Sequence, residues 1–398
     1  MKSLPTRLLL SLLLPLLASA QQPKRGSTGL EMQAARAEGL LVKGKKTYYP
    51  ADKWDLSDLP AYQAKEKVTG PIRLWGSNYI VDGNVGEYWE KAFREYHPGV
   101  KFEYNMLTTR AAVPSLVFGV ADLGMGRRIK SEELQLYQRY KNQDPLEIVI
   151  ATGSYNVTGW NPAFGIVVHQ DNPLTKITLE QLDGIYGAER LGGWIGTDWQ
   201  PEFARGPEKN LRTWGQLGLT GEWAKKEITP YGLNLRYSQA TWISDLILGG
   251  SDKWNERLRM YANFAAPEGG DGQGSSMGFG RLKRGLNEDL LQDPSGIAYV
   301  GSPVGPNLPP GLKLLEVAKT AAGPYYAYTI DNIRSRQYPL HDEIYAYADG
   351  KQAADMDPKV REYLRFIVSR EGQEAVMRDG KYLPLTAEAA REQLKKLQ

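Results

Sequence analysis

Residues 72–104 read IRLWGSNYIVDGNVGEYWEKAFREYHPGVKFEY and contain a complete strand–helix–strand pattern. Ile72–Trp75 has the composition of a short strand, and Gly76-Ser77-Asn78 follows it. Val100–Tyr104 alternates between apolar and polar side chains, as a second strand does. Between them, apolar side chains recur at three- and four-residue steps and predict an amphipathic helix. These positions are Val85, Tyr88, Trp89, Ala92, Phe93 and Tyr96. The order predicts a βαβ unit with two parallel strands.

The same alternation of short apolar strands and helices continues through the rest of the chain. A capping box, Thr178 with Gln181 three residues later, marks the start of one helix. Further strands are expected at Ala121–Met125, Leu146–Ala151, Gly165–Val168 and Ile297–Val300, and further helices at Val113–Val117, Ala240–Leu248 and Val360–Ile367. This pattern predicts an α/β fold. Residues 187–223, rich in Gly and Trp, and the glycine-rich stretch 267–280 are expected to be irregular.

Length and composition limit the class of protein. A chain of 398 residues is long enough for two domains. The 49 Lys and Arg residues nearly balance the 46 Asp and Glu residues, whereas binding to nucleic acid needs a predominantly basic surface. The absence of cysteine excludes disulfides and thiol nucleophiles. His97, His169 and His341 lie too far apart in the sequence to suggest a metal site, so neither a metal nor a cofactor is expected.

The first twenty residues have the features of a secretory signal peptide. Lys2 and Arg7 precede a leucine-rich run at Leu8–Leu17, and Ala18-Ser19-Ala20 forms an A-x-A cleavage site. The run is too short to span a bilayer as a helix. We therefore expect a periplasmic or secreted mature protein of residues 21–398. No lipid anchor is expected, because no cysteine follows the cleavage site.

Five short segments of the chain carry distinctive patterns. The first segment, residues 121–128, reads ADLGMGRR, and the second, residues 165–187, contains NPL, ITLEQL and IYG. The third segment, residues 296–301, reads GIAYVG. The fourth contains YPL at 338–340, and the fifth contains FIVSREGQ at 366–373 and GKYLPL at 380–385. In this order the segments resemble those of the phosphate-binding components of ABC phosphate importers, such as A-D-I-G-M-A-S-R and G-A-I-G-Y-V-G. These components belong to the superfamily of two-lobed periplasmic binding proteins, and the resemblance covers residues 72–385.

This resemblance implies the type II-like periplasmic binding-protein fold, in which each lobe is a mixed sheet flanked by helices and two hinge strands join the lobes. Lobe 1 is expected at residues 70–168 and 303–398, and lobe 2 at 169–302. Residues 21–69 would form an N-terminal extension with one short helix near Leu30–Leu41, and this extension would be packed loosely or disordered in part. The implied function is binding, not catalysis. A monomer would capture phosphate or a related oxyanion between its lobes and deliver it to an ABC permease in the inner membrane.

The resemblance also carries site residues over to this chain. In the family, the loop after the first strand donates backbone and hydroxyl hydrogen bonds to phosphate. Gly76, Ser77 and Asn78 occupy that loop here, and a tight turn with a helix cap is the alternative interpretation. A second family loop supplies a serine, and the matching position is Thr109, beside Thr108, without the usual glycines. Free N–H groups at the start of a helix favour an anion as the ligand.

The chain departs from the family pattern after ADLGMG. Some members have an aspartate at that position, which accepts a proton from phosphate, and others have a serine. This chain has Arg127, which can only donate. With Arg110 and Arg128 nearby, Arg127 would favour a larger or more highly charged anion; the alternative is that it points to solvent.

In lobe 2, the family has an arginine followed by S-G-T at the start of a helix. The matching residues here are Arg236, Ser238 and Thr241, without the glycine. Arg236 would clamp the anion with two hydrogen bonds, and a surface ion pair is the alternative. The glycine-rich stretch 267–280 would also line the space between the lobes.

Two other functions stay open from the sequence. Gly274–Gly278 fits G-x-S-x-G, the nucleophile elbow of serine hydrolases, with His341 as the only later histidine. That elbow needs a strand before it and a helix after it, whereas glycines flank it here. The second is a receptor for a sugar or another organic solute with the same architecture. Its basis is the 10 Trp and 23 Tyr residues, which can stack on sugar rings but would equally fill the lobes.

Overall fold

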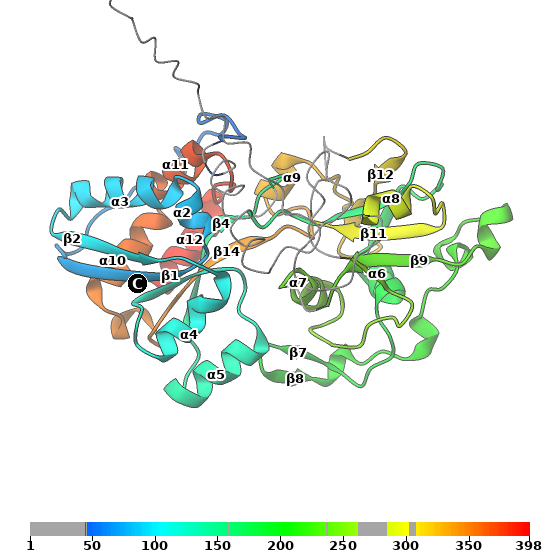
Figure 1. The fold of residues 1–398 in the computed structure, drawn as a ribbon, viewed down its shortest axis with the longest axis horizontal. Coiled ribbons are helices and arrows are strands. Elements are labelled where there is room, and N and C mark those ends of the chain that lie inside the picture. The colour runs from blue at the N-terminus through cyan, green and yellow to red at the C-terminus, as the bar shows by residue number, and fades with distance from the viewer. Residues whose placement is uncertain (1–43, 45, 158–159, 236–237, 262–284, 302–307) are drawn as a thin grey trace, which may run out of the picture.

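The protein folds into two bodies that lie side by side, each built around its own five-stranded sheet (Figure 1). The computed structural model describes residues 44, 46–157, 160–235, 238–261, 285–301 and 308–398. The first sheet contains β1 (Gly70–Gly76), β2 (Val100–Asn105), β3 (Leu123–Gly126), β4 (Leu146–Thr152) and β14 (Glu343–Ala348), in the order β2-β1-β3-β14-β4. The second contains β5 (Gly165–His169), β9 (Thr229–Leu233), β10 (Arg259–Tyr261), β11 (Gly296–Val300) and β12 (Leu312–Leu314), in the order β10-β9-β11-β5-β12.

Two smaller sheets belong to the second body. They pair β6 (Lys176–Thr178) with β13 (Glu316–Ala318), and β7 (Gly193–Ile195) with β8 (Asp198–Gln200).

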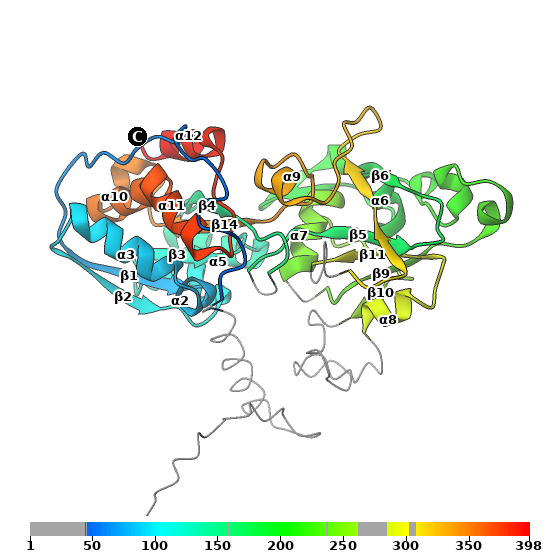
Figure 2. The ribbon, with the colours of Figure 1, turned by 90° about the horizontal axis from the view of Figure 1, so that it is seen from above.

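Helices cover both faces of the first sheet, as Figure 2 shows from above. The helices of lobe 1 are α2 (Tyr79–Asp82), α3 (Val85–Tyr96), α4 (Ala112–Val117), α5 (Ser131–Lys141), α10 (Pro358–Ile367), α11 (Arg370–Asp379) and α12 (Ala387–Lys396). The helices between β5 and β14 in the chain are α6 (Leu179–Tyr186), α7 (Ser238–Ile247), α8 (Leu286–Leu290) and α9 (Ile330–Arg334). Helix α4 packs on β1, β3 and β14, whereas α10 packs on β1 and β4. Within the described ranges, no helix is long and apolar enough to cross a membrane.

The predicted βαβ unit is confirmed. β1 pairs in parallel with β2, from Gly70 opposite Val100 to Trp75 opposite Asn105. The apolar stripe of α3 is buried, with Trp89 and Phe93 fully enclosed, because it faces the sheet and α10. The ring of Phe93 lies 5.1 Å from that of Tyr363 on α10. The α/β class and the two mixed sheets flanked by helices are therefore as predicted.

The lobe boundaries differ from those expected. β5 pairs antiparallel with β11 and β12, so residues 165–168 lie in the second sheet and not in lobe 1. Residues 312–314 lie there too, because β12 completes its edge. We propose that lobe 1 comprises residues 70–152 and 343–398, and lobe 2 residues 165–318. The described residues of the crossings between them, 153–157, 160–164 and 319–342, form loops and the helix α9.

The described part of the N-terminal extension, residues 46–69, is packed against lobe 1 and is not loose. The backbone N–H groups of Tyr48 and Tyr49 both donate to the Gly380 carbonyl. The Tyr62 hydroxyl donates to Glu362 at 2.7 Å. Five of its apolar side chains are buried: Tyr49, Leu56, Leu59, Tyr62 and Val68. The signal peptide and the helix expected near Leu30–Leu41 lie outside the described residues.

Candidate functional site

The three predicted ligand loops of lobe 1 lie next to one another. β1 is the shared neighbour of β2 and β3, and both pair with it in parallel. The loops after these strands therefore leave the same edge of the sheet, where open α/β sheets bind ligands. Gly76 at the end of β1 pairs with Met125, and a Cβ on Gly126 would lie 3.3 Å from Thr109. The fold thus brings Ser77, Thr109 and Arg127 to one place.

The first loop turns sharply at Gly76. This residue has a φ of +132°, and a Cβ on it would lie 1.9 Å from the Met125 carbonyl oxygen, so only glycine fits. The next residue, Ser77, donates its N–H to that same oxygen at 2.8 Å. Its side chain is 1% exposed, and its hydroxyl has no hydrogen-bond partner in the described chain apart from Tyr382. The hydroxyl of Tyr382, which is likewise buried and without another partner there, lies beside it, and the side-chain hydrogen bond between the two acts to lower the pKa of Tyr382 against the larger, opposite effect of burial.

Asn78 is engaged within its own helix. It is the N-cap of α2, and its side-chain amide donates to Asp82 Oδ2 at 2.5 Å. This agrees with the alternative of a turn at the start of a helix, and leaves Ser77 as the residue of this loop whose buried hydroxyl faces only the hydroxyl of Tyr382.

The second loop has the two predicted threonines in different roles. The Thr108 hydroxyl accepts from the Arg110 N–H at 3.4 Å and caps a short 3₁₀ turn, Thr109–Ala111. Thr108 is exposed, whereas Thr109 is half-buried beside Gly126. Of the pair, Thr109 is therefore the one nearer to the loop after β3.

In the third loop, Arg127 points into lobe 1 and not to solvent. It is 9% exposed, and its guanidinium lies 2.8 Å from the Glu133 carboxylate on α5. The loop is held to the first sheet, because the hydroxyl of Tyr347 on β14 accepts a hydrogen bond of 2.7 Å from the Ile129 N–H. The sequence pattern did not reveal Glu133 as the partner of this arginine.

Positive charges crowd around these loops. Burial lowers the pKa of Lys130, and the charges of Arg127 and Arg110 lower it further, whereas Glu132 and Glu133 act in the opposite direction. Burial is the largest cause of this shift, and the charges of Arg127 and Arg110 show that the three basic side chains lie close enough to interact. We refer to Arg110, Arg127 and Lys130 as the basic cluster.

Lobe 2 contributes α7 to the same region. Arg236 and the side chain of Ser238 lie outside the described residues, whereas Thr241 is half-buried on α7. Arg128, next to Arg127, forms an ion pair of 3.0 Å with Asp245 on α7. The guanidinium also lies 5.4 Å from the ring of Trp242. Arg128 is the last residue of the ADLGMGRR segment, but its partners lie more than a hundred residues away and leave no local signal.

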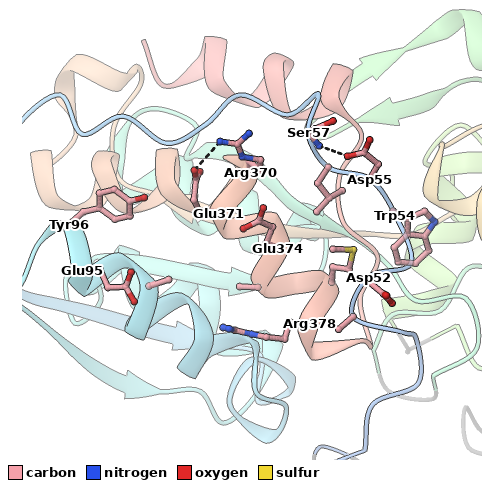
Figure 3. Close-up of a pocket in the computed structure, with 15 residues that line it drawn as sticks. Asp52, Trp54, Asp55, Ser57, Glu95, Tyr96, Arg370, Glu371, Glu374 and Arg378 are labelled. Atoms are coloured by element: carbon pink, nitrogen blue, oxygen red, sulfur yellow. Dashed lines mark hydrogen bonds and ion pairs between the residues drawn. The ribbon is translucent and has the colours of Figure 1, made fainter.

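A separate groove of about 870 Å³ lies on lobe 1 between the extension, α3 and α11 (Figure 3). Its walls carry Asp52, Glu95 and Glu374 together with Arg370 and Arg378. None of the predicted site residues lines it, so it is distinct from the predicted site.

The hydrolase motif cannot be compared with the structure, because Gly274–Gly278 and the whole stretch 267–280 lie outside the described residues. His341 lies close to two acceptors: its Nδ1 is 2.9 Å from the Tyr338 carbonyl oxygen, and its Nε2 is 3.7 Å from Glu343. Within the described ranges, no group of acidic and histidine side chains is arranged to hold a metal ion.

Comparison with known proteins decides the family. The model of the PBP superfamily domain matches residues 83–371. The chain belongs to the PBP superfamily. It is 28% identical over 340 residues to the phosphate-binding protein PstS of Pseudomonas aeruginosa, covering 85% of this chain and 90% of that protein. The resemblance deduced from the five segments is thereby confirmed.

Solved structures of PBP-superfamily proteins are also similar. PstS from Borrelia burgdorferi has a TM-score of 0.49 and 17% identity, and covers 81% of this chain and 100% of its own. An ABC-type phosphate transport receptor from Vibrio cholerae has a TM-score of 0.46 and 15% identity, covering 79% and 99%.

Proposed function

We propose that this chain is a periplasmic solute-binding protein that captures phosphate or a related oxyanion between its lobes for import by an ABC permease. The observation that carries the proposal is the basic cluster at the carboxyl ends of β2 and β3, near the buried hydroxyl of Ser77. The similarity to PstS, a phosphate-binding protein, supports the same ligand class.

The proposed mechanism is binding without bond making. Ser77 and Thr109 would donate hydroxyl hydrogen bonds, and Arg127 would donate charge-assisted ones while Glu133 holds its guanidinium in place. Thr241, with Arg236 and Ser238, would approach from lobe 2. Closure of the lobes removes water from the anion, which strengthens each of these interactions. No metal, cofactor or nucleic acid takes part, and the chain would act as a monomer.

Calorimetric titration of residues 21–398 tests the ligand. The protein is unfolded and refolded to remove bound ligand, and phosphate, sulfate and pyrophosphate are then added at fixed salt. Micromolar phosphate binding without competition by sulfate supports the phosphate receptor. Binding of sulfate or pyrophosphate alone moves the function to another oxyanion. Absence of heat with all three would contradict the oxyanion proposal and favour a receptor for a sugar.

We expect Arg127→Met to weaken phosphate binding by about tenfold to a hundredfold. A hydrogen bond to a charged group contributes about 1.5–3 kcal/mol, which corresponds to that range. The double variant Arg127→Met/Glu133→Gln avoids an unpaired half-buried carboxylate and should lose the same affinity. Arg139→Met, at an exposed position on α5, is the matched control and should bind as the parent does. Equal affinities in titrations of all four proteins would remove Arg127 from the site.

Export is proposed from the signal peptide. The mature protein should be found in the periplasmic fraction with Gln21 as its first residue, as N-terminal sequencing would show. A first residue upstream of position 18 would place the cleavage site elsewhere.

A further inference from the structure

The β7–β8 hairpin belongs to lobe 2 but reaches lobe 1 (Figure 1). Its turn is Gly196-Thr197, and Gly196 has a φ of +62°, as the first residue of a type II′ turn has. The Thr197 hydroxyl accepts a hydrogen bond of 2.9 Å from Nε2 of Gln138 on α5. A Cβ on Gly196 would lie 3.1 Å from Cδ2 of Leu134, so the turn rests directly on this helix.

The base of the hairpin is joined to the end of α7. The Trp194 N–H donates to the Gly249 carbonyl oxygen at 2.8 Å. A Cβ on Gly193 would lie 2.0 Å from that oxygen, and one on Gly250 would lie 2.2 Å from the Trp194 oxygen. Backbones this close leave no room for side chains between them. The hairpin and α7 therefore form one unit of lobe 2.

This unit holds a single stretch of lobe 1 at two points. The turn contacts α5, and Asp245 and Trp242 of α7 contact Arg128, which precedes α5. Both points lie within residues 127–141, which also include Arg127. In Figure 1 the hairpin lies toward the bottom of the molecule and α9, on one of the covalent crossings, toward the top. The lobes are thus bridged at both edges.

We propose that the β7–β8 hairpin is a strap that holds the two lobes together, and that ligand exchange between them requires its turn to leave α5. The contact is small enough to be reversible, because one neutral hydrogen bond shifts the equilibrium between attached and detached hairpin by about fivefold. Residues 193–200 thereby have a function that their irregular, Gly- and Trp-rich sequence does not indicate.

Lobe separation can be measured without any ligand. The chain has no cysteine, so Lys101→Cys on lobe 1 and Glu222→Cys on lobe 2, both exposed, give two unique positions for spin labels. Pulsed dipolar spectroscopy then reports the distribution of distances between the lobes. Gln138→Ala/Thr197→Ala should increase the open population about fivefold. Gln200→Ala, on β8, is the matched control and should leave it unchanged. Identical distributions in the two variants would overturn the strap.

A tether across the same contact gives the converse test. Gln138→Cys/Thr197→Cys is joined by a short bis-maleimide with a disulfide in its spacer. Release of bound inorganic phosphate should slow at least tenfold, and reduction of the spacer should restore the parent rate. An unchanged release rate would show that the strap does not gate exchange. This second readout rests on the proposed function, whereas the distance measurement does not, so failure of phosphate binding would leave the strap decided by the distances.

Discussion

Asp342→Asn is expected to stabilise the folded protein by about 4 kcal/mol at pH 7. Asp342 precedes β14 and is 8% exposed. Burial raises its pKa from 3.8 to about 8, and the neighbouring charge of Glu343 acts in the same direction. Its Oδ1 accepts the Glu343 N–H at 2.7 Å, a bond that asparagine can keep. Asparagine resembles the protonated acid but has no proton to lose.

The sign of the pH dependence follows from the raised pKa. Below pH 3.8 the carboxyl is protonated in both the folded and the unfolded chain, and its contribution to stability is fully present. As the pH rises toward about 8, the unfolded chain ionises while the folded one does not, so this stability is lost. Asp342→Asn does not lose this stability as the pH rises, because asparagine has no proton to lose. Its advantage over the parent should therefore widen by about 1.4 kcal/mol per pH unit between pH 5 and pH 7, and by less as the pH approaches the folded-state pKa of about 8.

Urea unfolding of parent and variant at pH 5, 6, 7 and 8 measures this difference. Glu343 does not interfere: burial alone would raise its pKa, but the hydrogen bond from His341 and the charge of Arg336 hold it at about 2. Asp252→Asn is the control, because this carboxylate is 89% exposed. A stability gap between Asp342→Asn and parent that does not change with pH would show that Asp342 is ionised in the folded protein.

Local patterns predicted the elements, whereas contacts between distant segments had to come from the structure. The helix at 85–96 follows from the spacing of its apolar residues, and Thr178 caps its helix by accepting from the Gln181 N–H at 3.1 Å, as the capping box predicts. The assignment of β5 depends on pairing with β11, more than a hundred residues later, and no local pattern specifies that pairing. The lobe boundaries that we propose from the two sheets therefore differ from those drawn from the resemblance, with lobe 1 ending at residue 152 instead of 168 and resuming at 343 instead of 303.

The positions of the candidate site residues were likewise predictable, whereas their contacts with distant segments were not. The resemblance placed Ser77, Thr109 and Arg127 on three loops, and the parallel order of β2, β1 and β3 brings those loops together. The sequence did not indicate that Arg127 pairs with Glu133 or that Arg128 reaches Asp245. Ion pairs are set by side-chain direction and by packing between elements, which residue type and spacing do not encode.

Lys381→Met is expected to destabilise the protein by about 3–5 kcal/mol, because it leaves a buried charge without its partner. Lys381 and Asp379 are 0% and 1% exposed, and Nζ lies 2.8 Å from Asp379 Oδ1. The ammonium also donates to the Asp379 carbonyl at 3.1 Å, at the end of α11. The Asp379 carboxylate accepts the N–H of Asn84, the N-cap of α3, at 2.7 Å. One buried pair thus joins the C-terminal end of α11 to the N-terminus of α3.

The double variant Lys381→Met/Asp379→Asn separates the charge from the packing. Removal of both charges should recover most of the lost stability, because a buried ion pair replaced as a unit costs far less than one broken in half. Lys395→Met, at an exposed position on α12, is the control. Burial already raises the pKa of Asp379 with its lysine present, and loss of the lysine raises it further. The deficit of the single variant should therefore shrink as the pH falls, since protonation removes the unpaired charge.

These effects on unfolding bear on the site as well. Tyr382, the next residue after Lys381, lies beside Ser77, and Lys381 Nζ lies 5.9 Å from the ring of Trp160, which packs on Tyr79. The ion pair therefore supports the loop that holds the Ser77 hydroxyl. Lys381→Met should weaken phosphate binding, and the double variant should recover both binding and stability. Recovery of stability without recovery of binding would mean that the lysine itself, and not the fixed position of this loop, is what the anion requires.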